Sequence, residues 1–217
     1  MNSKHVYFVR HGESVANATG IRHGEETLLT SLGKIQAEQV TKRLLKIRIE
    51  RIVKSPFVRT RETSAVIEQE LHGIPVSESS LFIERVNPSV MRDRHKHDPE
   101  MIRIWDEIEK NYHTHDWHHS DEENFEDLRD RAMRAMKFLE TLPENRILVV
   151  THGLFMKAIF AHVLLGGKLN GRVFWDCFVP AKTVRNTGIM HLEYTENFHK
   201  TGMYWKLISW NDHAHLE

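Results

Sequence analysis

Two histidine-glycine pairs, far apart in the chain, carry side chains that can handle a phosphoryl group. His11 follows Arg10 at the end of the apolar run Val6–Val9, and His152 comes shortly after the apolar run Ile147–Val150. An imidazole can serve as a nucleophile or as a cation, and a guanidinium can offer parallel donors to two phosphate oxygens. Together these residue types indicate a local pocket for an anion.

The apolar runs before both pairs have the composition of strands buried on both faces of a parallel sheet. If these strands are parallel neighbours, His11 and His152 meet beyond their carboxyl ends, where open α/β sheets bind ligands. Arg59 follows the predicted short strand Arg51–Lys54 and lies in the first turn of the next predicted helix. It is therefore predicted to direct a second guanidinium at the same rim, with Arg61 as the less favoured alternative.

The remaining pattern alternates between helix and strand. A stripe from Gly33 to Ile47 predicts a helix capped by Thr30 or Ser31. The stretch from Pro75 to Ile83 predicts a strand that ends at Glu84. Further helices are predicted around residues 101–108, 125–142 and 154–165. The β-branched and aromatic stretch between Phe174 and Trp210 predicts two or three strands, some of them antiparallel.

Length and composition exclude several classes of protein. The 217 residues favour a single domain spanning 1–217. Thirty basic and thirty acidic side chains balance, which argues against nucleic acid as a partner. The chain has one cysteine and no long apolar span, so we expect no membrane partner and a cytoplasmic location.

Three segments in order resemble the signature of the histidine phosphatase superfamily, in the branch that includes cofactor-dependent phosphoglycerate mutases. They are Arg10–Ser14, Ser55–Arg59 with Thr63 downstream, and Thr151–Gly153. Supporting matches extend from Leu29 to Leu216 and include Asn124–Leu128 with Arg131, so the resemblance covers nearly the whole chain. It implies an α/β fold: three α/β/α layers around a mostly parallel central sheet with an antiparallel strand, as in phosphoglycerate mutases.

The resemblance also implies roles for the residues. His11 would be the nucleophile that forms a phosphohistidine, while Arg10, Arg59 and His152 would bind the phosphoryl oxygens. For this chemistry His11 must be neutral, whereas His152 is more useful protonated, a form that a bound phosphate favours. The two imidazoles are therefore expected to take opposite charge states.

Glu84 is the candidate acid and base, and Asn17 is a further candidate. Glu84-Arg85 resembles the place where this branch keeps its acid, although Val86-Asn87-Pro88-Ser89 replaces the usual glycine-rich continuation. Glu84 would protonate the leaving oxygen and then activate water, with Glu78 as the alternative. Asn17 either donates its amide to phosphate or closes a turn.

The segment 85–123 is predicted to be a lid or insertion, and its histidine-rich part 95–119 could offer metal ligands. The spacing lacks H-E-x-x-H and a cysteine pair, so we expect no metal and no cofactor. A homodimer stays open, with Trp205 or Trp210 as exposed interface candidates.

Three functions remain. The favoured one is a phosphomonoester hydrolase that acts through phosphohistidine on a small-molecule phosphate ester. The alternatives are a cofactor-dependent phosphoglycerate mutase and a weakly active phospholigand-binding protein. The short chain and the departure after Glu84 favour the phosphatase.

Overall fold

A mixed six-stranded sheet forms the centre of the molecule, seen here in a computed structural model that describes residues 3–22, 24–181, 184–196 and 202–217. The strand order is β3-β2-β4-β1-β5-β6. Parallel pairing joins β1 to β4, β4 to β2 and β2 to β3, whereas β5 is antiparallel to both of its neighbours. The strands are β1 (Lys4–Arg10), β2 (Arg51–Lys54), β3 (Val76–Glu78), β4 (Arg146–Thr151), β5 (Ile189–Glu196) and β6 (Met203–Asp212).

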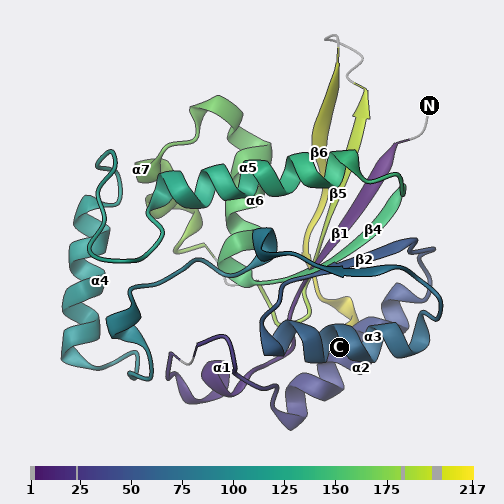
Figure 1. Cartoon of the computed structure of the whole chain (residues 1–217), viewed down its shortest axis with the longest axis horizontal. Coiled ribbons are helices and arrows are strands. Elements are labelled where there is room, and N and C mark those ends of the chain that lie inside the picture. The colour runs from purple at the N-terminus through teal and green to yellow at the C-terminus, as the bar shows by residue number, and fades with distance from the viewer. Residues whose placement is uncertain (1–2, 23, 182–183, 197–201) are drawn as a thin grey trace.

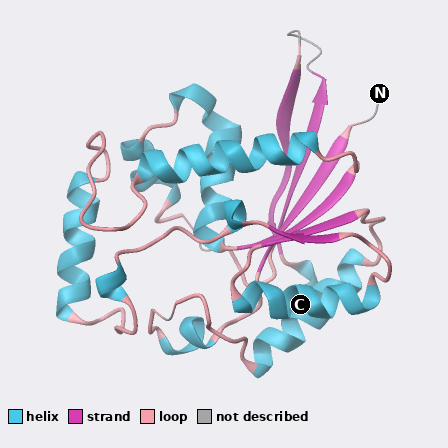
Figure 2. Ribbon diagram, in the orientation of Figure 1, coloured by secondary structure: helices cyan, strands magenta, loops and turns pink. Residues whose placement is uncertain are grey.

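Helices cover both faces of this sheet, so the fold is the three-layer α/β/α arrangement predicted above (Figures 1 and 2). Helices α2 and α3 pack together on one face, and α5 and α6 pack together on the other. The helices are α1 (Val15–Thr19), α2 (Ser31–Leu44), α3 (Val58–Glu70), α4 (Pro99–Asn111), α5 (Phe125–Thr141), α6 (Gly153–Leu165) and α7 (Gly171–Val173). None of the helices in the described ranges is long and apolar enough to cross a lipid bilayer.

Strand β4 shows why its sequence is apolar without alternation. Ile147 and Val149 belong to the core beneath α5 and α6, while Leu148 and Val150 belong to the core beneath α2 and α3. All four are fully buried. Because both faces of the sheet are covered, both sets of side chains leave water.

The register of β1 and β4 brings the two histidine-glycine pairs together. Arg10 pairs with Thr151 at the carboxyl ends of these parallel strands, so His11 and His152 follow at the same edge.

Helix α2 begins after Thr30, which is its N-cap, as predicted. The Thr30 side chain accepts the N–H of Gly33. A Cβ on Gly33 would lie 2.0 Å from the carbonyl oxygen of Glu13, so only glycine permits this close approach.

Two predicted elements were wrong. The stretch from Pro75 to Ile83 holds only the short strand β3 before a 3₁₀ turn at Ser80–Phe82, so Glu84 does not end a strand. The segment from Phe174 to Phe178 forms a π-helical turn rather than a strand. The ring of Phe174 packs against the rings of Phe125 and Phe178 in the core. In both places burial in tertiary contacts overrides the preference of β-branched and aromatic residues for strands.

The C-terminal tryptophans are not exposed, contrary to expectation. Trp205 is half-buried and its indole N–H donates to Glu140 at 3.0 Å. Trp210 stacks on Phe160 with ring centroids 4.2 Å apart. These two side chains therefore give no support to a dimer interface.

Three further short 3₁₀ turns lie at Ser89–Met91, Gly166–Lys168 and Ala214–Leu216.

Candidate active site

His11 is held in the orientation that a nucleophile needs. Its Nδ1 lies 2.7 Å from the carbonyl oxygen of Gly12, which can only accept, so Nδ1 carries the proton and the lone pair is on Nε2. The side chain is 3% exposed. Burial first, and then the charges of Arg59 and Arg10, hold the pKa of His11 well below its ordinary value of 6.5. His11 is therefore neutral at pH 7, as attack on phosphorus requires.

His152 lies beside it, with the two ring centroids 5.2 Å apart. Its Nε2 is 2.8 Å from the hydroxyl of Ser55, and its Nδ1 is buried with no hydrogen-bond partner among the described residues. Burial first and then the charge of Arg59 also hold the pKa of His152 well below 6.5. Burial therefore favours the neutral form of both imidazoles, and the expected opposite charge states depend on the negative charge of a phosphate.

Arg10 and Arg59 supply the positive charge. Arg59 Nε lies 3.3 Å from His11 Nε2, and its Nη1 donates to the carbonyl of Gly24. Burial lowers the pKa of Arg59 to about 10, so it stays charged at neutral pH. Arg10 Nη1 donates to the carbonyl of Val184, while its buried Nε has no partner within the described ranges. Arg59 thus contacts the imidazole of His11, and the charges of both guanidinium groups act on its pKa.

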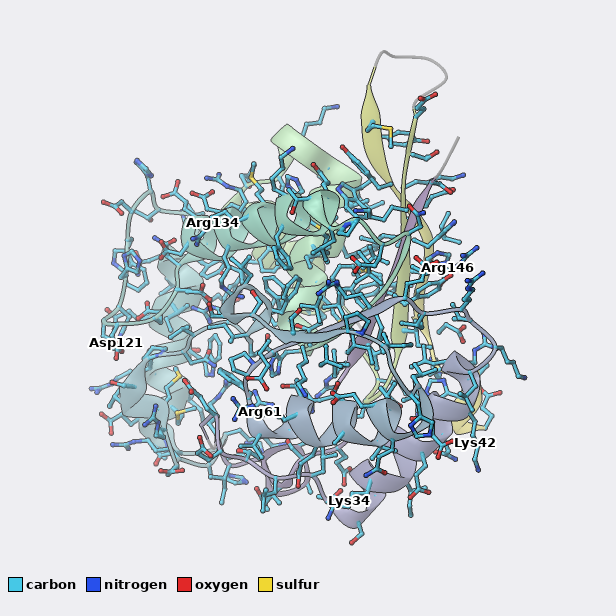
Figure 3. The ribbon with its side chains drawn as sticks, turned by 45° about the vertical axis from the view of Figure 1, so that its right-hand side comes forward. Lys34, Lys42, Arg61, Asp121, Arg134 and Arg146 are labelled. Atoms are coloured by element: carbon cyan, nitrogen blue, oxygen red, sulfur yellow. The ribbon has the colours of Figure 1, made fainter. Side chains whose placement is uncertain are left out.

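Arg61, the less favoured alternative to Arg59, points away from His11. It forms a two-pronged ion pair with Glu78, with distances of 2.9 and 2.8 Å, on the outer side of α3 (Figure 3). Both side chains are substantially exposed, and neither borders the pocket described below. The structure therefore brings Arg59, and not Arg61, to His11, and it places the fallback acid Glu78 outside the site.

Glu84 borders the same pocket as Arg59 although it follows a turn rather than a strand. Its carboxylate accepts the backbone N–H groups of Leu154 and Phe155 in the first turn of α6, at 3.2 and 3.0 Å. Its Oε1 also accepts the N–H of Arg85. These donors fix the carboxylate at the wall of the pocket, within the positive end of the helix dipole.

Asn17 closes a turn. It is the third residue of α1 in a capping box with Ser14, and its Oδ1 also accepts from Asn186 Nδ2 at 3.1 Å. The same Nδ2 donates to the backbone carbonyl of His11. Asn17 is thus connected to the nucleophile through Asn186, and amide donation to phosphate stays a prediction.

The sequence of the chain agrees with this geometry. The sequence model of the Histidine phosphatase superfamily (branch 1) matches residues 6–212. The chain belongs to the histidine phosphatase superfamily. The matched range includes both histidines and both arginines of the site, which the fold brings together.

One curated relative and two solved structures show what this superfamily member is similar to. The "Probable phosphoglycerate mutase GpmB" of Shigella boydii serotype 18 is 29% identical over 98% of this chain and 94% of the relative. Among solved structures, Bacillus stearothermophilus YhfR superposes with a TM-score of 0.79 at 21% identity, over 99% of this chain and 100% of that one. The alpha-ribazole phosphatase of Shigella flexneri gives a TM-score of 0.73 at 22% identity, over 96% of each chain.

A hollow of about 130 Å³ lies beside Arg59 and Glu84 in this histidine phosphatase family member. His11 is not among the residues that line it, and Arg59 connects the hollow to His11. The segment 85–123 provides much of its wall through residues 85–89, 91 and 92. Phe57, Gly24, Glu25 and Arg22 complete the wall. Segment 85–123 therefore borders the pocket, and its opening and closing as a lid stays a prediction.

Sequence reasoning missed several contributors. Ser55 contacts His152; in the sequence it stands at a strand end and in the signature segment Ser55–Arg59, but neither pattern predicts a contact with the site. Asn186 and Val184 contact the site from the turn before β5, where the sequence has no periodic pattern. Thr63, which the family pattern did mark, accepts the N–H of Gly12 and donates to the carbonyl of Arg59.

The histidine-rich segment pairs with acidic side chains. His115 contacts Glu126 at 2.7 Å, and His118 contacts Asp127 at the same distance. Across the ranges that the structure describes, no group of three or more His, Cys, Asp or Glu side chains is arranged to hold a metal ion. These histidines anchor the segment to the start of α5.

Proposed function

We propose that this chain is a phosphomonoester hydrolase that acts through a covalent phosphohistidine at His11 on a small phosphorylated metabolite. The observation that carries the proposal is the state of His11. Its Nδ1–H is fixed on the carbonyl of Gly12, which leaves the lone pair on Nε2, where Arg59 donates to it; the charge of Arg10 also acts on the ring, and His152 lies beside it. Membership of the histidine phosphatase superfamily supports the same assignment.

In the first step Nε2 attacks phosphorus and the ester oxygen leaves. Arg59 donates to the Nε2 lone pair in the ligand-free site, so a bound phosphoryl group must take over that donor before attack. Arg10, Arg59 and His152 then hold the phosphoryl oxygens as the transition state develops. Negative charge from the phosphate favours protonation of His152, which burial and the neighbouring arginines disfavour.

Glu84 acts first as the general acid and then as the general base. In its acid form it donates a proton to the departing alkoxide, which leaves as an alcohol. The resulting carboxylate then accepts a proton from water as the water oxygen bonds to phosphorus and the phosphorus–nitrogen bond breaks. Inorganic phosphate and neutral His11 are the products, so the carboxyl group and the imidazole are both regenerated.

A phosphoglycerate mutase is the second candidate, because a relative with that name matches almost the whole chain. It would use the same residues and return the phosphoryl group to the organic product instead of to water. Segment 85–123, which lacks the glycine-rich continuation after Glu84, forms the wall where the organic part would bind, and this favours the phosphatase.

The test is an assay of 4-nitrophenyl phosphate and a panel of sugar, glycerate and nucleotide phosphates. Intact mass after a quench without acid should show a phosphorylated protein, because phosphohistidine is acid-labile. His11→Ala should lose the adduct and at least on the order of a thousandfold in turnover. Activity of His11→Ala within about tenfold of the parent would refute the mechanism. Transfer between two- and three-phosphoglycerate would identify the mutase, and no turnover of any ester would identify a phospholigand-binding protein.

A further inference from the structure

A second hollow adjoins the hollow beside Arg59 and Glu84 and shares part of its wall. The second hollow has a volume of about 450 Å³, and the residues common to both walls are Arg22, Glu84, Arg85 and Asn87. Because Glu84 stands in both walls, an ester whose leaving oxygen lies at Glu84 would extend its alcohol part into the second hollow. The rest of the wall is mostly apolar and aromatic and consists of Trp105, Leu154, Trp175 and Val179, with Glu109 at the rim.

Arg85 is a buried cation that forms no ion pair with a carboxylate among the residues that the structure describes. Its side chain is 3% exposed, and its Nε donates to the backbone carbonyl of Glu123 at 3.0 Å. Nη1 reaches the amide oxygen of Asn87, whereas the buried Nη2 has no hydrogen-bond partner among the described residues. The neighbouring carboxylate of Glu122 feels the charge of Arg85 but is itself occupied by backbone N–H groups. A charge buried in this way is costly unless a counter-charge arrives.

Arg22 completes a pair of cations on one aromatic platform. Its guanidinium lies 4.8 Å from the ring centroid of Trp105, and that of Arg85 lies 5.5 Å from the same ring. The Arg22 Nε is buried and, like Arg85 Nη2, lacks a partner within the described ranges. Within the ranges that the structure describes, neither Arg22 nor Arg85 forms an ion pair with a carboxylate. Two like charges are therefore held together beside the place where the alcohol part would lie.

We propose that Arg22 and Arg85 form a second anion-binding subsite, so that the substrate is a phosphate monoester whose alcohol part carries a carboxylate or a second phosphate. Trp105 and Trp175, with ring centroids 5.9 Å apart, receive the apolar body of that alcohol. The anion takes the free N–H groups of both guanidinium groups and relieves their mutual repulsion. This inference rests on the proposed function, since it names the substrate class of the same site.

The test compares three esters that differ only in the added group: phenyl phosphate, para-carboxyphenyl phosphate and para-phenylene bisphosphate. The parent protein should prefer at least one doubly anionic ester by about tenfold or more in kcat/KM, the effect of one charge-assisted hydrogen-bonded contact. Preference for the carboxylate or for the second phosphate identifies which anion the subsite takes. Arg22→Gln should reduce the preference to below about threefold; because the preference is a ratio of kcat/KM values within one variant, a general loss of turnover cancels from it.

Arg85→Gln should act in the same direction, but its burial makes a folding defect a competing cause. Arg22→Gln, which removes a less buried side chain, keeps the test decisive. Arg103→Gln, in an exposed side chain on α4, is the matched control and should keep the full preference. Calorimetric binding of phenylphosphonate and para-carboxyphenylphosphonate provides a second measurement that needs no turnover.

Two outcomes would overturn the inference: equal kcat/KM for the three esters in the parent, or an undiminished preference in Arg22→Gln. If phenyl phosphate is turned over and labels His11 but charge gives no preference, the second subsite is wrong and the proposed function stands. If no ester is turned over and no adduct forms, the proposed function fails, and the substrate class fails with it.

Discussion

Arg59 and Arg61 are two positions apart in the sequence and meet opposite environments. The guanidinium of Arg59 is turned inward over the ring of Phe57 and reaches His11, whereas Arg61 is turned outward to Glu78. Successive residues on a helix are about 100° apart around its axis, so residues two positions apart lie on nearly opposite sides. This difference makes the two arginines a matched pair for experiment.

Arg59→Ala should weaken binding of inorganic vanadate by about tenfold to a hundredfold, because a desolvated charged donor to the phosphoryl oxygens is lost. Arg61→Ala should change vanadate binding by less than about twofold, because exposed ion pairs contribute little. Calorimetric titration of each variant measures both values. Equal losses in the two variants would show that Arg59 has no special place in the site.

The protonation of His11 and His152 is testable by nitrogen NMR of the imidazoles. In the ligand-free protein both should be neutral at pH 6.5, because burial and the neighbouring arginines lower both pKa values. Saturating inorganic phosphate should protonate His152 and leave His11 neutral, since its lone pair is needed for attack. A charged His152 in the free protein, or two charged rings in the complex, would contradict this division.

At the scale of elements, α5 holds the turn that presents Glu84. Arg131 on α5 donates to the backbone carbonyls of Leu81, Ile83 and Glu84, and it forms a two-pronged ion pair with Glu123. The Arg131 side chain is 6% exposed. One residue thus ties a turn from the middle of the chain to a helix some 50 residues later.

Arg131→Met should lower the free energy of unfolding by about 3–5 kcal/mol, because it leaves Glu123 and the carbonyls buried without their donor. In the fraction that stays folded it should lower kcat more than it raises KM, since Glu84 loses its support while the phosphate-binding arginines remain. Denaturant unfolding and steady-state kinetics measure the two effects. Arg134→Met, on an exposed position of the same helix (Figure 3), is the control and should change neither.

At the scale of the whole molecule, burial keeps several histidines neutral. Burial is the first cause that lowers the pKa of His11, His152, His162, His191 and His215, and that of His191 falls to about 4. In the unfolded chain these groups regain pKa values near 6.5. Below that pH the unfolded state therefore binds more protons than the folded state, and stability must fall as the pH falls.

The fully buried pair His11 and His152 should alone remove about 2 kcal/mol from the free energy of unfolding between pH 6.5 and 5.5. Stability should be complete about one pH unit or more above 6.5, and the loss should start as the groups in the unfolded chain begin to titrate. Denaturant unfolding at a series of pH values measures the slope. His11→Asn should show a shallower slope by about half of that loss, and an unchanged slope would show that His11 is protonated in the folded protein.

The strands and helices near the catalytic residues could be predicted because their signals are local. Apolar strands that stop at His-Gly, the cap at Thr30 and the stripe of α2 each depend on residues close in sequence. The strand expected before Glu84 and the strands expected from Phe174 could not, because there tertiary packing decides between strand and turn. The partners Ser55, Asn186 and Arg131 are equally invisible to periodicity, since each acts across a long sequence separation.

By itself, the sequence determined the alternation of helices and strands, the superfamily and the residue types of the site, because these follow from composition, period and ordered motifs. Motif spacing favoured Arg59 over Arg61, but only the tertiary structure decided that Arg59 Nε reaches His11, that burial keeps both imidazoles neutral, and that Arg22 and Arg85 share an aromatic platform. The physical reason is that desolvation, charge proximity and side-chain direction depend on distances between groups far apart in the chain. Such distances exist only once the strands have paired and the helices have packed.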